Sequence, residues 1–582
     1  MADAKLAGQI VRMRQRRTGP LILELDLTDG IADGPPQDPL AALLTIRRTR
    51  LPDLLDGLKR AASDDRVRAL VVKVGGSRIG LAKVQELRDA VLEFRQSGKL
   101  AVAWSESFGD FVRGNVPYYL ATGFDRVYLQ PSGTLGLTGV AVEQVFLHGA
   151  LERLGIDFQS AKRHEYKSAA DQLTETGFSP PAREAAARMA ESLTEQLAAA
   201  IAAGRGLTVE HSLALLARGP FLAQQALSER LVDGLLYRDQ VYEQVRKEAG
   251  ADATLLYLQR YRRTHSLSDL PRRLGSGVRE LAPGQPERFV AMIYAHGAIR
   301  SGRSGRGGAG MGSDTVAAAL RAATADDGAR AVVLRVNSPG GSYTASDVIW
   351  REVVRVRTAG KPVVVSRGDV AASGGYFISA PADVIVAQPA TITGSIGVIL
   401  GKPVLQELFE RLGVSTDLVA DGAANATMFS SSRPFSDADW SRINEWLDAV
   451  YADFTEKVAT GRRMDVGRVH ELARGRVWTG ADAVANGLAD QTGGMREAIA
   501  IARLRAGLPD DAPARPYPRF GPFDQLRPAE SSESRPAAAG SLGAGAVAAL
   551  FADGWGPAWR FAAAAGLPPY GPLALPGVWK IS

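Results

Sequence analysis

The 582-residue chain contains no cysteine and only six histidines. The absence of cysteine excludes thiol nucleophiles, cysteine-ligated metals and disulfides, and it leaves the cellular compartment open. The histidines lie in no pattern typical of a metal or catalytic site, and HELAR at 470–474 has an arginine where an HExxH metalloprotease needs its second histidine. We therefore expect no metal and no cofactor.

Long apolar runs are also missing. No stretch of 18 or more apolar residues occurs, so we expect no membrane-spanning helix. The N-terminal residues before the first expected strand contain no apolar stretch of signal-peptide length. These absences predict a protein that is cytoplasmic or peripherally associated with a membrane.

The composition is that of a soluble globular protein, with 46% hydrophobic and 23% charged residues. The chain is too long for one ordinary core, so two or more domains are expected. Its net charge of +6 is spread over many residues, and no RNA-binding or zinc-finger signature accompanies it. We expect no nucleic-acid partner.

The chain contains an internal duplication. SDDRVRALVVKV at 63–74 matches ADDGARAVVLRV at 325–336, an offset of 262 residues. YYLATGFDRVYLQPSGTLGLTGV at 118–140 matches YFISAPADVIVAQPATITGSIGV at 376–398, where the offset has changed to 258. This agreement over about two hundred residues indicates two copies of one structural unit.

We place the first copy at residues 20–260 and the second copy at residues 288–505. A polar linker rich in Pro and Gly, 261–287, joins them, and a basic segment, 1–19, precedes them. A Pro/Gly/Ala-rich tail, 506–582, belongs to neither copy. Within each copy, short β-branched runs alternate with amphipathic helical patterns, which predicts βαβ crossovers and an α/β fold.

The copies differ where a catalytic site would lie. A strand of the second copy leads into NSPGGS at 337–342, where Gly340 and Gly341 stand opposite Arg78 and Ile79 of the first copy. Paired glycines let backbone N–H groups approach a ligand closely, as an oxyanion hole requires. The same residues are also typical of an ordinary Pro-Gly turn.

A serine of the second copy has no counterpart in the first. Ser373, within GDVAASGGYFISAPAD at 368–383, lies opposite Asn115 or Phe111, depending on the offset used. It opens an expected short helix, where it fits two roles equally well. It is either an ordinary N-cap or a nucleophile whose developing oxyanion is near the N–H of Gly374.

The first copy supplies a candidate base. Ser373 does not lie in a GxSxG nucleophile elbow, and no histidine motif accompanies it, so a lysine is the remaining plausible general base. Lys167 lies in the basic and aromatic segment RHEYKSAADQLT, and its counterpart in the second copy is Asn425. Because each copy lacks what the other carries, we predict one composite site built from both.

Four segments together, NSPGG, GDVAASGGYFISAPAD, TITGSIGV and YKSAADQLT, resemble the long form of signal peptide peptidase A, also called protease IV. That family of tandem-repeat serine proteases is related to Clp protease and to the crotonase superfold. The resemblance covers about residues 20–505. It implies a tandem duplication of a Clp protease/crotonase-like βαβ unit and a serine endopeptidase that degrades apolar peptides, such as cleaved signal peptides.

The resemblance also implies a role for each site residue. Ser373 would be the nucleophile and Lys167 the general base, and Ser395 of TGSIGV would hold the lysine amine in position. A lysine in water has a pKa near 10.4 and is protonated at pH 7, so Lys167 must be desolvated to accept a proton.

The oxyanion donors implied by the resemblance are backbone amides of the second copy. One is Gly374, and the other is Gly340 or Gly341, of which we favour Gly341.

The resemblance raises two further expectations, and the composition of the tail raises a third. Family members of this length usually have an N-terminal membrane anchor, which we do not find here, and they assemble as tetramers. The apolar pieces at 541–570 either dock on the protein itself or, aided by the basic RMRQRR at 12–17, form a peripheral membrane contact.

Two alternatives to a protease stay open. A crotonase-like acyl-CoA enzyme would also use strand-linked oxyanion amides, and would turn over thioesters without labelling of Ser373 by a fluorophosphonate. In a non-catalytic scaffold, Ser373→Ala would change no measurable property of the protein.

Overall fold

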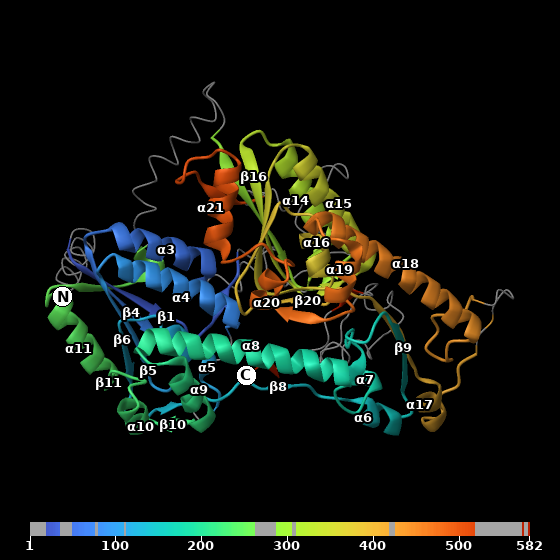
Figure 1. Cartoon of the computed structure of the whole chain (residues 1–582), viewed down its shortest axis with the longest axis horizontal. Helices are drawn as coiled ribbons and strands as arrows, with labels where there is room; N and C mark the ends of the chain where they lie inside the picture. Colours follow the sequence, from blue (N-terminus) through green and yellow to red (C-terminus); the bar gives the residue numbers. More distant parts are fainter. Residues whose placement is uncertain are drawn as a thin grey trace, which may run out of the picture.

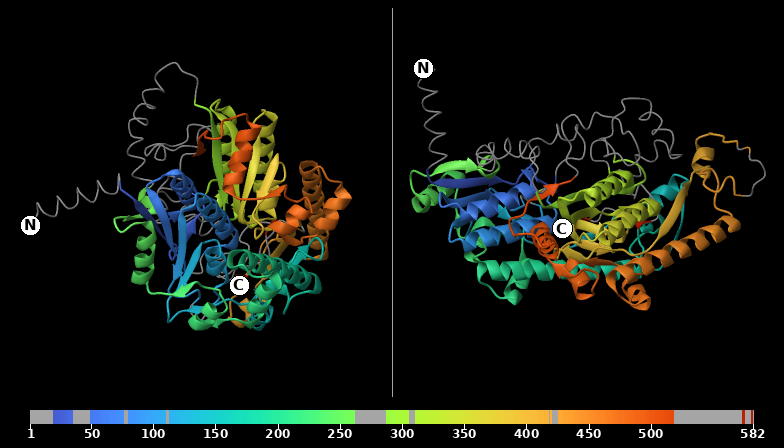
Figure 2. Two further views of the ribbon diagram at one scale, coloured as in Figure 1. Left: turned by 60° about the vertical axis from the view of Figure 1, so that its left-hand side comes forward. Right: turned by 90° about the horizontal axis from the view of Figure 1, so that it is seen from above.

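The computed structural model describes residues 19–34, 49–75, 79–109, 112–261, 287–304, 310–417, 419 and 425–517, and the backbone of two short strands at 573–574 and 580–581. Three stretches singled out in the sequence lie outside these residues: the basic RMRQRR at 12–17, most of the linker and the apolar pieces at 541–570. Two sheets with mainly parallel strands lie side by side, one in each copy of the duplication (Figures 1 and 2). This confirms the predicted α/β class.

The first copy forms a six-stranded parallel sheet. Its central strands are apolar and buried, because helices cover both faces and leave no face for polar side chains. The strand order is β11 (Gly234–Leu235), β6 (Arg126–Leu129), β5 (Leu100–Ser105), β4 (Val67–Lys73), β1 (Leu21–Asp26) and β12 (Thr254–Tyr257).

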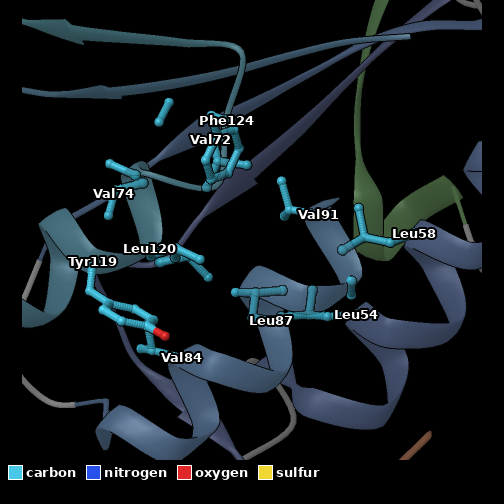
Figure 3. Packing of buried hydrophobic residues seen from close by; sticks show 14 of the residues in the cluster. Leu54, Leu58, Val72, Val74, Val84, Leu87, Val91, Tyr119, Leu120 and Phe124 are labelled. Atoms are coloured by element: carbon cyan, nitrogen blue, oxygen red, sulfur yellow. The ribbon is translucent and has the colours of Figure 1, made fainter. Parts of the chain in front are cut away.

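Helices α3 (Leu51–Ser63) and α4 (Leu81–Gln96) cover one face of this sheet, and α11 (Arg238–Ala249) covers the other. The apolar residues of α3 and α4 recur at helical spacing, so that Leu54 and Leu87 reach the same buried cluster as Val72 of β4 (Figure 3).

The second copy repeats this plan around a larger sheet. Its strand order is β22 (Val477–Thr479), β20 (Ile392–Gly394), β18 (Val363–Ala372), β16 (Ala329–Ser338), β13 (Phe289–His296) and β24 (Ala514–Pro516); β19 (Val384–Ala387) also pairs with β18, and β23 (Gln491–Thr492) with β19. The sheet therefore extends past residue 505, the expected end of the second copy, because β24 lies in the segment that the sequence analysis assigned to the tail. The short run that forms β24 includes a proline and gave no strand pattern of its own.

The duplication is visible in matching elements. Helix α14 (Ser313–Ala325) is 13 residues long, as is α3, and α15 (Tyr343–Thr358) is 16 residues long, as is α4. Lys99 and Lys361, which stand 262 residues apart, donate equivalent hydrogen bonds: Lys99 to carbonyls at the C-terminal end of α3, and Lys361 to carbonyls at the C-terminal end of α14. The repeat thus preserves individual side-chain contacts as well as the order of elements.

A long helix and a buried ionic network join the two copies. Helix α8 (Pro180–Arg205) of the first copy runs along both units, and its Met189 and Leu193 pack with Val477 of the second copy (Figure 1). Arg335 of β16, which is fully buried, contacts Glu86 of α4 at 2.6 Å and Asp33 at 3.2 Å. The mutual orientation of the copies is therefore fixed by interlocking contacts.

None of the helices within the described ranges is both long and apolar enough to cross a bilayer.

We predict that Arg335→Met destabilises the protein by about 3–5 kcal/mol, because it leaves the buried carboxylate of Glu86 without the cation it pairs with and removes one of the two cations that pair with Asp33. Urea unfolding of the variant and the wild type measures this change. Arg351→Met, on the exposed surface of α15, is the matched control and should unfold like the wild type. Equal midpoints for the two variants would contradict the assigned role of Arg335.

Candidate active site

Ser373 lies at the junction between β18 and the short helix α16 (Gly374–Ser379). Its backbone has φ 53° and ψ −115°, an uncommon conformation for a residue with a side chain, and one that often marks functional sites. The residue is fully buried, and its hydroxyl caps no helix N–H. The N-cap role considered for Ser373 is therefore not the one its side chain takes.

Lys167 of the first copy reaches this serine. It lies in the loop between β9 (Asp157–Lys162) and α7 (Asp171–Thr174), and its Nζ is 2.9 Å from Ser373 Oγ. The same Nζ is 3.0 Å from both the carbonyl oxygen and the Oγ of Ser395. The structure therefore brings together three residues that the sequence analysis named, two from the second copy and one from the first.

The surroundings of Lys167 favour an uncharged amine. The side chain is fully buried, and this desolvation lowers its pKa well below the ordinary value. No carboxylate among the described residues offsets that effect. A neutral amine has two N–H donors and one lone pair, which match the two oxygens of Ser395 and the hydroxyl proton of Ser373.

The segment 474–476 of the second copy holds both sides of the site together. Its Arg474 carbonyl accepts the N–H of Tyr166, and its Arg476 carbonyl accepts the N–H of Ser395. Between them, Gly475 has φ 84° and lies so close to the lysine loop that a Cβ there would be 2.4 Å from the backbone nitrogen of Lys167. Only glycine fits this close approach.

The sequence analysis did not identify the segment 474–476. An Arg-Gly pair outside every matched motif was its only signal, and its contacts with the lysine loop connect residues about three hundred positions apart.

The glycine pair forms strand β17 (Gly340–Gly341) beside α16. The N–H of Gly340 donates to Ser338 Oγ at 3.2 Å. The nitrogen of Gly341 faces α16, since it would lie 3.2 Å from a Cβ built on Gly374. Both glycines have positive φ, 105° and 152°, so the pair is not an ordinary turn that other residues could form.

The equivalent places in the first copy hold no such site. Asn115 begins helix α5 (Asn115–Ala121), and its Oδ1 accepts the N–H of Thr138. Asn425, the counterpart of Lys167, is exposed to solvent. The duplicated fold therefore carries one candidate active site, to which each copy contributes.

Comparison with known proteins gives matches in both copies. A family model described as "Peptidase family S49" matches residues 93–252 and 355–508. "Protease 4" of Salmonella typhi is 32% identical over 472 residues, which cover 80% of this chain and 73% of that protein. "Serine protease SPPA, chloroplastic" of Arabidopsis thaliana is 29% identical over 465 residues, which cover 79% of this chain and 66% of that protein. These alignments thus span 66 to 73% of the relatives' own lengths.

Among solved structures, the chain is similar to a mutant of ClpP1 from Listeria monocytogenes, with 12% identity and a TM-score of 0.24 over 36% of this chain and 94% of that one. The strand order of the two sheets, described above, defines the fold independently of this likeness.

The lowered pKa of Lys167 predicts a pH dependence of stability. As the pH falls below about 10.5, the unfolded chain takes up a proton on this lysine and the folded chain does not, so the wild type should lose about 1.4 kcal/mol per pH unit until the folded-state pKa is reached. Lys167→Met removes the titrating amine, so the variant should not show this loss of unfolding free energy. The difference in unfolding free energy between Lys167→Met and the wild type should therefore grow from pH 10.5 to pH 8 in denaturant titrations. A difference independent of pH would show that the buried amine is charged.

Proposed function

The chain belongs to Peptidase family S49, a family of serine proteases, and on this premise we propose that it is an endopeptidase whose reaction centre is the pair of Ser373 and Lys167. The membership confirms the resemblance to signal peptide peptidase A and protease IV. One observation carries the assignment of the pair: a fully buried amine from one copy lies 2.9 Å from a serine hydroxyl of the other.

The proposed reaction has two steps. Ser373 Oγ attacks the peptide carbonyl while the neutral Lys167 amine takes the hydroxyl proton, and the resulting ammonium then protonates the leaving amine, which gives an acyl-enzyme. In the second step Lys167 takes a proton from water as that water attacks the ester, and the proton returns to Ser373 as the acid leaves. The hydrogen bonds from Lys167 to Ser395 support a role for Ser395 in aiming the lone pair at Ser373.

Backbone amides would stabilise the negative oxygen that forms during attack. We assign this role to the N–H groups of Gly374, which follows the serine in the chain, and of Gly341, whose nitrogen lies close to Gly374. The bond from Gly340 to Ser338 supports the choice of Gly341, because the amide of Gly340 is already engaged. Amides fixed in this way need no reorganisation as charge develops.

The edge of β17 would bind the substrate backbone. Residues 573–574 of the chain pair with Gly340 and Gly341 in antiparallel orientation as β25 (Leu573–Ala574), which supports the binding of an extended peptide at this edge by strand addition. We extend the proposal, from the family resemblance, to apolar peptides such as cleaved signal peptides and to a tetrameric assembly.

Replacement of either reacting residue should abolish hydrolysis. Ser373→Ala and Lys167→Met should each lower kcat on an unstructured apolar peptide by at least about a thousandfold, because nucleophile and base act as a unit. Circular dichroism checks that both variants keep the fold. Ser63→Ala and Lys247→Met, at exposed positions, are the matched controls and should keep full activity. Full activity of Lys167→Met would refute the base, and thioester turnover without labelling of Ser373 by a fluorophosphonate would favour the acyl-CoA alternative.

Weakening of β25 should make the edge of β17 more accessible to added peptide. The double variant Leu573→Pro/Ala574→Pro removes two backbone N–H donors, and KM should fall roughly fivefold, equivalent to ~1 kcal/mol, while kcat stays the same. Ala537→Pro, elsewhere in the tail, is the control. An unchanged KM in the double variant would mean that β25 does not compete with substrate.

A further inference from the structure

A cluster of three aromatic rings lies next to the loop that carries Lys167. It consists of His164 from the first copy, Tyr451 of α18 (Asp437–Arg462) and His470 of α19 (Val466–Leu472) from the second copy. The ring of His164 lies 4.5 Å from that of Tyr451 and 4.7 Å from that of His470, measured between centroids. The ring cluster is thus a contact between the copies, three residues away from the lysine.

The ring cluster is connected to the active site by hydrogen bonds. The hydroxyl of Tyr451 lies 3.0 Å from His470 Nδ1 and accepts the N–H of Arg474 at 3.3 Å. Arg474 begins the segment 474–476, whose carbonyls hold Tyr166 and Ser395. On the other side, the carbonyl of His164 accepts the N–H of Lys167 at 3.4 Å.

The backbone at the ring cluster is held in an uncommon conformation. His164 and Arg474 both have positive φ, 66° and 54°, although neither is glycine. Such residues persist only where the surrounding contacts fix them. The contact of the His164 ring with Tyr451 and His470 anchors this part of the lysine loop to the second copy, alongside the ion pairs of Arg163 with Asp448 and of Glu165 with Arg474.

We propose that His164, Tyr451 and His470 are positioning residues, which hold the Lys167 amine against Ser373 only while both imidazoles are uncharged. The inference rests on the proposed function of Lys167 as the base. It assigns the ring cluster no contact with the substrate.

The charged groups around the ring cluster indicate that protonation of its imidazoles would weaken the contact between the rings. The cationic groups that face it are Arg163 on the lysine loop and Arg474, and the anionic ones are Glu165 and Asp448. Each carboxylate is already paired, Glu165 with Arg474 and Asp448 with Arg163. Two imidazolium rings in contact would therefore repel each other without a free counter-ion.

Protonation would also change the hydrogen bonds. In the tautomer whose Nδ1 carries no proton, His470 accepts the hydroxyl proton of Tyr451, and protonation of the ring would turn Nδ1 into a donor and reverse this bond. Burial, and then the neighbouring His470, lower the pKa of His164, which agrees with a ring cluster that favours uncharged imidazoles.

The first test is Tyr451→Phe, which keeps the ring and removes the hydroxyl that links His470 to Arg474. We expect kcat for the apolar peptide to fall roughly 10- to 100-fold, as misplacement of a base by about 1 Å would cause, with KM within about twofold of the wild type. Thermal unfolding checks that the fold is kept. A wild-type kcat in a folded Tyr451→Phe protein would overturn the proposal.

The second test is the pH profile of kcat. In the wild type, protonation of Lys167 alone gives a slope of one on the acid side, and protonation of the ring cluster at His164, whose pKa is lowered by burial, should add a further ionisation that makes the slope steeper at the acid end. The double variant His164→Phe/His470→Phe keeps ring packing without titration, and its slope should stay at one. His211→Phe, on an exposed helix of the first copy, is the control and should retain the steeper limb. A wild-type slope of one throughout would overturn the proposal.

The two proposals fail in distinguishable ways. If Lys167→Met keeps full activity, the assignment of the base is wrong. If Lys167→Met is inactive while Tyr451→Phe and the double histidine variant behave like the wild type, the base stands and the ring cluster does not position it.

Discussion

The site depends on a lysine amine that is kept away from water and from acidic side chains. An exposed lysine would be protonated at neutral pH and could not act as the base that the proposed function requires. Full burial of Lys167 lowers its pKa, and three oxygen atoms from two serines surround its nitrogen. The ionic network at Arg335 and the long helix α8 hold together the two copies between which this amine is buried.

The duplication explains how such a site could be built. Two copies of one α/β unit provide two surfaces that pack against each other, and the contact between them excludes water from residues near its centre. The first copy keeps the helices and strands of the plan but has Asn115 where the second has Ser373. The first copy instead supplies Lys167, which is buried where the two copies meet.

Much of this arrangement could be predicted from the sequence because the two copies could be compared with each other. Matching runs gave the α/β class, and mismatched positions gave Ser373, Lys167 and the glycine pair. The segment 474–476 could not be found in this way, because its role depends on backbone carbonyls and on a close approach to Lys167, which leave no pattern in the side chains. Strand β24 was missed because it is short and gains its stability from pairing with β13.

Under the proposed mechanism, the same geometry would determine when, during synthesis, the protein becomes reactive. Lys167 leaves the ribosome first, Ser373 follows 206 residues later, and Gly475, which closes against the lysine loop, comes later still. Until that last segment is translated, the lysine is solvated and protonated, and the serine has no partner to take its proton. Under the proposed mechanism a nascent chain would therefore be inert toward its neighbours, and would acquire a reactive hydroxyl only after nearly the whole of the second copy has emerged and folded.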